Sequence, residues 1–174
     1  LEIAVKADAD GSYTTLDPRQ KLNPTPYASF ARTIYRKTIV VKPVTPAGST
    51  TDNGQALLDA FASITDADWG NHYLVKVEPG MYNMGNNHLD MIPYVDLEGS
   101  GQDITLIYAD GSNTEGTGSV IAANNSEIRS ITVMSFGRPS DPKNYATAVY
   151  VPQGVTTKMK DVTLKAFNGI LYSR

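Results

Sequence analysis

The sequence predicts an all-β solenoid, a β-helix in which successive turns of chain stack on one another. A pattern of small polar, β-branched, Thr and aliphatic residues occurs three times, at 103–106, 130–133 and 161–164. The copies recur after 27 and 31 residues, and the last two share a longer gapless frame, 127–133 with 158–164. Recurrence of strand-forming residues on this scale is typical of repeat folds. Chance similarity of three β-rich runs is the alternative.

In a stacked solenoid, like residues fall above like, so the repeats also predict the columns of the core. We expect Ile104, Ile131 and Val162 to pack in one column. The predicted core stack consists of the β-branched and aliphatic members of the three copies: Ile104, Leu106, Ile131, Val133, Val162 and Leu164.

Composition limits the possible functions. The 174 residues suit one domain, or one domain with an appendage, and 41% apolar residues can build a core. A net charge of −3 argues against a nucleic-acid surface, and the lack of cysteine excludes disulfides and thiolate sites. No stretch reaches the roughly 18 apolar residues of a membrane span. Low charge with many small polar residues favours a secreted or cell-surface bacterial protein, and no cofactor or metal is expected.

Residues 1–33 are predicted to form an N-terminal arm. Residues 1–6 alternate apolar and polar side chains like a half-buried strand, and residues 13–16 form a second short strand. Three prolines between 18 and 26 then favour an extended connector. Because a lone strand or hairpin is unstable, the arm needs a sheet to join. Both chain ends are expected to be cuts from a longer polypeptide.

The connector has a family resemblance. The residues Leu16-Asp17-Pro18-Arg19-Gln20-Lys21-Leu22 and Pro26-Tyr27-Ala28 resemble the "L-x-P-R-Q-x-L-x-x-x-P-Y-A" joint of large bacterial surface and fibre-like proteins. The resemblance implies a modular extracellular protein and no activity.

Residues 34–174 are predicted to form the β-helix. The segment 33–44 is rich in β-branched residues and reads as a strand. A capping helix is predicted at about 53–65, with Thr51 or Asp52 as its N-cap and one apolar stripe along it. We expect this helix to cover the open end of the solenoid, because terminal rungs need covers.

The rungs that follow carry a second resemblance. A strand at 73–77, then Glu78-Pro79-Gly80-Met81-Tyr82, and the run from Val95 to Ile107 are similar to the first rungs of pectin-lyase-like proteins. The resemblance covers roughly residues 50–172 and implies a right-handed parallel β-helix. Three short strands per rung are expected, and the later ones lie at 119–122, 127–133, 147–151, 158–164 and 169–172.

The pectin-lyase-like resemblance also implies where chemistry would lie. Enzymes of this type use paired carboxylates, or a carboxylate pair with Arg. The available acids are Asp96, Glu98, Asp103, Asp110 and Glu115, with Arg129 and Lys160 as cations. Asp96 and Glu98 lie two residues apart and so point to the same side of a strand. The favoured interpretation is nevertheless a solvated strand face with cross-strand charge pairing. The methylesterase run "G-x-x-D-F-I-F-G" and the lyase run "W-x-D-H" are both absent, which argues against an enzyme.

Two further groups have open interpretations. Trp69, Tyr73, Tyr82 and Tyr94 form either a sugar-binding platform or rim packing, and packing is favoured at strand ends. His72 and His88 have no neighbours at metal-ligand spacing.

The leading functional prediction is a non-enzymatic structural or adhesive protein that assembles head to tail into filaments by strand donation. The alternatives are a polysaccharide-binding or polysaccharide-degrading β-helix and a trimeric phage-type fibre. The predicted assembly arm contains the apolar, proline and connector residues of the N-terminus: Leu1, Ile3, Val5, Tyr13, Leu16, Pro18, Arg19, Leu22, Pro26 and Tyr27.

Overall fold

The computed structural model describes residues 4–5, 14–15, 37–44, 49–109, 118–136, 146–166 and 168–172. The chain divides into two compact units, Leu1–Ile34 and Tyr35–Arg174. In the first unit, strand β1 (Ala4–Val5) pairs antiparallel with β2 (Thr14–Thr15). The N-terminal strand therefore has a partner within its own unit. The residues of the predicted assembly arm other than Val5 lie outside the described residues, as do Asp110 and Glu115.

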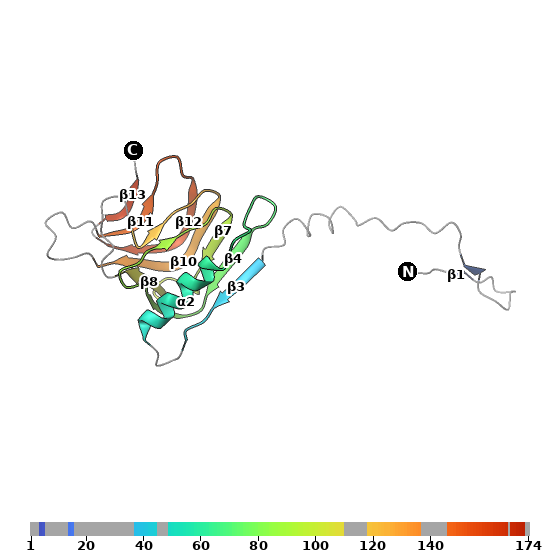
Figure 1. The fold of residues 1–174 in the computed structure, drawn as a ribbon, viewed down its shortest axis with the longest axis horizontal. Helices are drawn as coiled ribbons and strands as arrows, with labels where there is room; N and C mark the ends of the chain where they lie inside the picture. Colours follow the sequence, from blue (N-terminus) through green and yellow to red (C-terminus); the bar gives the residue numbers. More distant parts are fainter. Residues whose placement is uncertain are drawn as a thin grey trace. The chain divides into compact units, whose positions relative to one another are not determined.

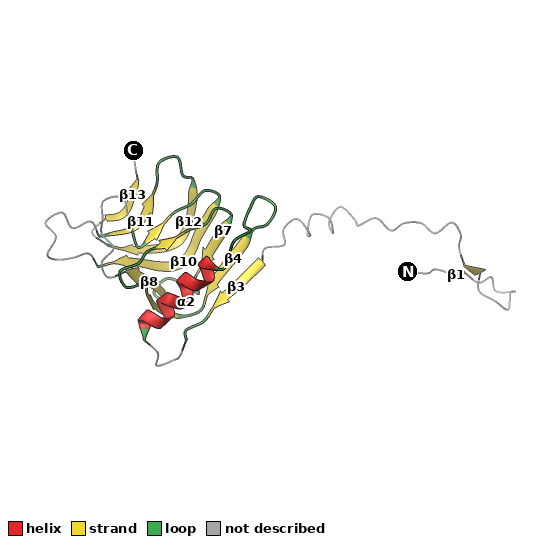
Figure 2. Ribbon diagram, viewed as in Figure 1, coloured by secondary structure: helices red, strands yellow, loops and turns green. Residues whose placement is uncertain are grey.

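The second unit confirms the all-β parallel β-helix, and the strand pairs among its described residues are all parallel. One line of stacked strands is β3, β4, β7, β10 and β12, as Figures 1 and 2 show. A second line is β5, β8 and the far half of β10, and a third is β6, β9, β11 and β13. The bounds are β3 Lys37–Val41, β4 Tyr73–Val77, β5 Gly80–Asn83, β6 Leu89–Asp90, β7 Val95–Glu98, β8 Thr105–Ala109, β9 Val120–Ile121, β10 Ser126–Ser135, β11 Thr147–Val151, β12 Thr157–Lys165 and β13 Asn168–Tyr172.

Strands β10 and β12 each span two of these lines because they bend in the middle. The bends lie at Ser130 and Asp161, both with φ of 53°. In the preceding rung, Asp103 has φ of 59° and lies in the turn between β7 and β8. The left-handed region is unusual for residues other than Gly, and Asp is among those that tolerate it best. The small polar residue that opens each sequence repeat therefore forms the corner of its rung.

The predicted core column is wrong at Ile104. This side chain is 52% exposed, since it lies in the turn before β8. Leu106 pairs with Thr132, so the first copy is displaced by one residue from the predicted alignment, and Ile107 takes the core position beside Val133. The later copies stack in the predicted frame, with Ile131 beside Val162 and Val133 beside Leu164.

The core lies inside the coil of chain. One column runs through Ile39, Val75, Leu97, Ile128 and Met159, which occupy paired positions on successive strands. Val75, Leu97 and Ile128 are fully buried, whereas Ile39 and Met159 are partly exposed. Alternate residues of the same strands face outward, as the pleat requires.

The helix α2 (Thr50–Ala62) begins earlier than predicted, and its N-cap is Ser49, whose hydroxyl accepts from the amide of Thr51. It packs chiefly against β5 and also contacts β3 and β4. Figure 2 shows the helix beside β3 and β4. Thr51 and Asp52, the predicted N-cap candidates, lie inside the helix. Asn53 and Gly54 are helical because the packing of α2 outweighs their low helix propensity. None of the described helices is long and apolar enough to cross a membrane.

Candidate functional site

The candidate site lies on the outer face of the sheet formed by β4, β7, β10 and β12. Val95 and Leu97 of β7 point into the core, so Asp96 and Glu98 between and after them point outward. On the next strand, Arg129 pairs with Glu98 in register. Glu127 lies two residues before Arg129 and so shares its outward face. Stacking thus brings three carboxylates and one guanidinium together.

Arg129 is the centre of this charged cluster. Its Nη2 lies 2.6 Å from Glu98 Oε2, and its Nε donates to the same oxygen at 2.8 Å. Its Nη1 lies 3.4 Å from Asp96 Oδ2 and 3.5 Å from Glu127 Oε1. Lys76 of β4 adds a second cation, with Nζ 3.5 Å from Glu98 Oε1. The arrangement is a carboxylate pair, Asp96 and Glu127, bridged by one guanidinium nitrogen.

The expected solvated strand face is wrong for Asp96, which is only 5% exposed. A buried carboxylate is costly unless hydrogen bonds and opposite charge compensate for lost water. The backbone amide of Glu127 donates to Asp96 Oδ1 at 3.0 Å, and Arg129 supplies the positive charge. Cross-strand charge pairing itself is present, and it involves Arg129.

Contacts within the cluster shift the pKa values of Glu98 and Arg129. Burial alone would raise the pKa of Glu98, but hydrogen bonds and charge from Arg129, together with Lys76, hold it below the ordinary value. Burial lowers the pKa of Arg129, yet the facing carboxylates raise it above the ordinary value overall. Glu98 is therefore ionised at neutral pH and keeps the guanidinium in place.

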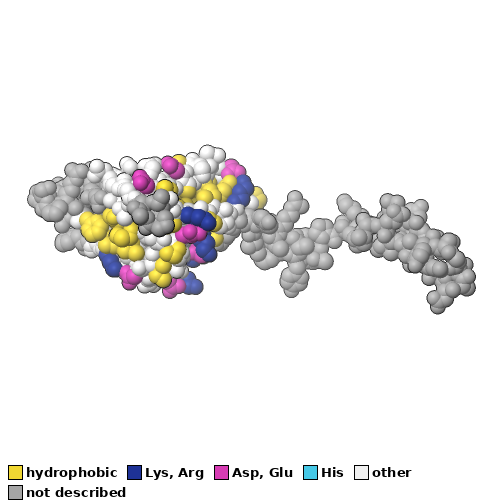
Figure 3. Space-filling model, turned by 90° about the horizontal axis from the view of Figure 1, so that it is seen from below, with side chains coloured by type: hydrophobic (Ala, Val, Ile, Leu, Met, Phe, Trp, Pro, Cys, Tyr) yellow, Lys and Arg dark blue, Asp and Glu magenta, His cyan; other side chains and the backbone are white. Residues whose placement is uncertain are grey.

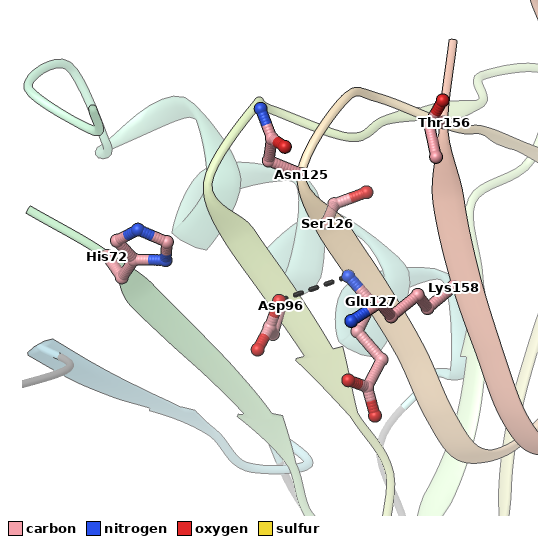
Figure 4. A pocket seen from close by; sticks show the side chains of 7 residues that line it. All are labelled: His72, Asp96, Asn125, Ser126, Glu127, Thr156 and Lys158. Atoms are coloured by element: carbon pink, nitrogen blue, oxygen red, sulfur yellow. Dashed lines mark hydrogen bonds between the residues drawn. The ribbon is translucent and has the colours of Figure 1, made fainter. Parts of the chain in front are cut away.

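A hollow of about 270 Å³ opens beside the carboxylate pair. Figure 4 shows that its lining comes from several rungs, with Asp96 on β7 held by the Glu127 amide. Every lining side chain carries a polar group, and both carboxylates of the bridged pair belong to it. The lining residues are His72, Asp96, Asn125, Ser126, Glu127, Thr156 and Lys158.

The aromatic residues predicted as a platform separate into two groups. Tyr73 and Tyr82 are buried, and the Tyr82 hydroxyl donates to the carbonyl of Glu78, so these two pack as favoured. Tyr94 lies edge-on to His72, with ring centroids 5.2 Å apart. Trp69 is 81% exposed.

The remaining predicted residues lie outside the cluster. Asp103 pairs with Lys165, with Oδ1 and Nζ 2.6 Å apart, and Lys160 pairs in register with Arg129 and is exposed. His88 Nε2 lies 3.4 Å from Asp90 Oδ1. Within the described part of the chain, no group of three or more potential ligands could hold a metal ion. Figure 3 shows acidic and basic side chains side by side on the face drawn.

Glu127 was not predicted as a site residue, and the hollow with Lys158 was not predicted either. A signal existed, because Asp96 and Glu127 are separated by 31 residues, as are Glu98 and Arg129. That separation equals the step between the second and third repeat copies. The separation is hard to recognise in the sequence, because the repeated pattern begins at residue 103, after the strand that carries Asp96 and Glu98.

Neither the family models nor the curated proteins compared with this sequence give a match. Solved structures of similar fold include three pectin methylesterase structures. A pectin methylesterase in complex with hexasaccharide VII has 18% identity and a TM-score of 0.54 over 80% of this chain and 46% of that one. Pectin methylesterase PemA from Erwinia chrysanthemi has 17% identity and a TM-score of 0.53, over 76% and 44%. A pectin methylesterase variant in complex with hexasaccharide IV has 19% identity and a TM-score of 0.56, over 81% and 46%.

These similarities show a shared parallel β-helix fold, and this chain spans less than half the length of each protein. They also correct the leading functional prediction. A structural fibre protein was expected, but the similar solved structures are enzymes named for pectin. Strand donation was predicted because the N-terminal strand had no evident partner. In the structure this strand, β1, pairs with β2.

Proposed function

We propose that this β-helix acts on a polysaccharide, as a carbohydrate esterase whose site is the Arg129 cluster. The observation that carries the proposal is Asp96, a buried carboxylate that lines an open polar hollow. A buried ionisable group beside a cleft is a candidate for catalysis. The fold shared with pectin methylesterases supports a glycan ester as the substrate. An extracellular location belongs to the same proposal.

Each residue of the cluster has a proposed role in ester hydrolysis. Asp96 and Glu127 line the hollow. One carboxylate takes a proton from the attacking water as the water oxygen bonds to the ester carbon, and it gives this proton to the alcohol oxygen as the bond between that oxygen and the ester carbon breaks. The other carboxylate orients the water. Lys158, the cation in the lining, stabilises the negative charge that develops on the ester oxygen. Arg129 does not line the hollow and holds Asp96 and Glu127 in position through its Nη1. Glu98 and Lys76 do not line the hollow and act by positioning Arg129.

The test is release of alcohol from methyl-esterified pectin by the purified chain. We expect turnover, and we expect Asp96→Asn to reduce it by roughly 10²–10⁴-fold, the usual contribution of a general acid or base. Asp90→Asn is the matched control, because Asp90 is an exposed carboxylate on β6, a strand outside the sheet that carries the cluster.

Circular dichroism of each variant checks that the β-helix is intact. Equal turnover by wild type and Asp96→Asn would assign the chemistry to another site. Failure of the wild-type chain to release alcohol from the ester would refute esterase activity of this chain.

A further inference from the structure

The loop that precedes His72, a residue of the hollow, carries a side chain with no structural explanation in the fold. Trp69 is 81% exposed, more than any other large hydrophobic residue among those described. It is also the single tryptophan of the chain. Exposure of an indole forgoes the hydrophobic stabilisation that its burial would give. Trp69 therefore contributes nothing to the core.

The loop that carries Trp69, residues 66–71, is held by hydrogen bonds at both ends. Asn71 Nδ2 donates to the carbonyl of Asp66 at 2.7 Å, and the Gly70 amide donates to Asp68 Oδ1 at 2.7 Å. The carboxylate of Asp66 accepts from the Tyr73 hydroxyl and, at 2.9 Å, from Lys37 Nζ. The loop thus presents an exposed aromatic plane from a fixed backbone, which lowers the entropic cost of binding.

The loop is joined directly to the candidate site. His72 lines the polar hollow, and its Nε2 donates to the carbonyl of Trp69 at 3.1 Å. Tyr94 packs against the same imidazole. An aromatic plane therefore lies on the loop that leads into a hollow lined by hydroxyl, amide and charged groups.

We propose that Trp69 is a binding residue that stacks against one pyranose ring of a polysaccharide whose next rings enter the hollow. A pyranose ring has a C–H face that suits the negative face of an indole, and its hydroxyls suit polar partners such as Asn125 and Thr156. An apolar peptide segment would leave these polar groups unpaired, which is unfavourable. The inference rests on the proposed function in taking the ligand to be a polysaccharide.

The single tryptophan makes a direct test possible. Three hexasaccharides are titrated separately into the full chain. They are methyl-esterified hexagalacturonate, unesterified hexagalacturonate and cellohexaose. We expect at least one to change the intrinsic tryptophan fluorescence saturably. By calorimetry, Trp69→Ala should raise the Kd for that probe roughly tenfold, and Trp69→Phe by less than about threefold, because a phenyl ring keeps the stacking face.

Phe136→Ala is the matched control, because Phe136 is another exposed aromatic, at 56%, and is not part of the hollow. It should leave the Kd unchanged. The inference is overturned if no probe binds, if a probe binds without changing tryptophan emission, or if Trp69→Ala binds as tightly as wild type.

This result is separable from the test of the esterase proposal. Asp96→Asn should keep the fluorescence change even where turnover is lost. Saturable fluorescence change without turnover by the wild-type chain supports stacking at Trp69 and refutes the esterase. Turnover with unchanged fluorescence supports the esterase and refutes stacking.

Discussion

At the scale of single residues, the cluster around Arg129 shows how a β-helix keeps charge on a strand face. Each carboxylate alone would lose hydration without compensation. Arg129 faces three of them at 2.6–3.5 Å, and the Glu127 amide donates a hydrogen bond to Asp96. Removal of one charged residue leaves the remaining charges unbalanced. The resulting loss of folding free energy is larger than the net contribution of an intact ion pair.

The lowered pKa of Glu98 predicts an acid-dependent contribution to stability. Its carboxylate is more easily ionised in the folded state, so its contribution is full above the ordinary pKa of 4.5 and is lost as pH falls through the lower folded value. Glu98→Gln should therefore destabilise the fold by about 1 kcal/mol at neutral pH. The difference from wild type should shrink below the ordinary pKa.

Urea unfolding of both proteins at neutral and acidic pH measures this difference. The comparison with wild type cancels the other carboxylates with lowered pKa, Asp66 and Asp103, which both proteins retain. If the difference did not depend on pH, Glu98 would contribute to the stability of the fold through packing and not through its charge.

At the scale of elements, the seat of α2 is set by two adjacent residues. Asn53 accepts from the Val44 amide at 2.8 Å and donates to the Met81 carbonyl at 3.0 Å, so it ties the helix to the segment after β3 and to β5. Gly54 lies so close to β5 that an added Cβ would be 1.8 Å from the Asn83 carbonyl oxygen. The helix rests with its backbone against the strand.

Gly54→Ala should therefore destabilise the protein, although Ala favours helix more than Gly does by about 1 kcal/mol. The clash is with backbone, which cannot rotate away, so we expect a loss of about 1–3 kcal/mol in urea unfolding. Gly70→Ala is the control, since its added Cβ would meet only Asp68 Oδ1, at 3.5 Å. Equal effects of the two substitutions would contradict the proposed close contact.

At the scale of the whole molecule, burial differs along the stack of rungs. Leu97 and Met159 occupy the same inner column, but Leu97 is fully buried between two rungs and Met159 is partly exposed. In a repeat fold each rung is stabilised by its neighbours, so a position with neighbours on both sides should matter most.

Leu97→Ala should cost about 2–5 kcal/mol, because it opens a cavity in a closed part of the core. Met159→Ala should cost clearly less, because part of that side chain already contacts water. Urea unfolding of each variant, analysed by its midpoint and its m-value, measures the two losses of unfolding free energy. Equal losses would indicate that the column is closed to the same degree at both rungs.

Much of the fold could be predicted from the sequence, because its signals are local or periodic. The β-branched runs and the small polar residue at each corner repeat with the rungs. The sequence repeat therefore marks Ser130 and Asp161, the residues at which β10 and β12 bend. The apolar stripe of α2 predicts a helix with one buried face, and Leu57 and Phe61 are indeed buried. The start of that helix at Thr50 could not be predicted, because the contacts that hold Asn53 and Gly54 in its first turns come from β5.

The site depended on register, which the sequence encodes only weakly. Ile104 was predicted to lie in the core. Because the strand pairing differs by one residue from the prediction, Ile104 lies at the surface. By itself the sequence determined that this chain is a β-solenoid with charges on alternate strand positions. Only the tertiary structure decided that Asp96, Glu127 and Arg129 meet and that Asp96 is buried, because contacts between rungs join residues 31 and 33 positions apart.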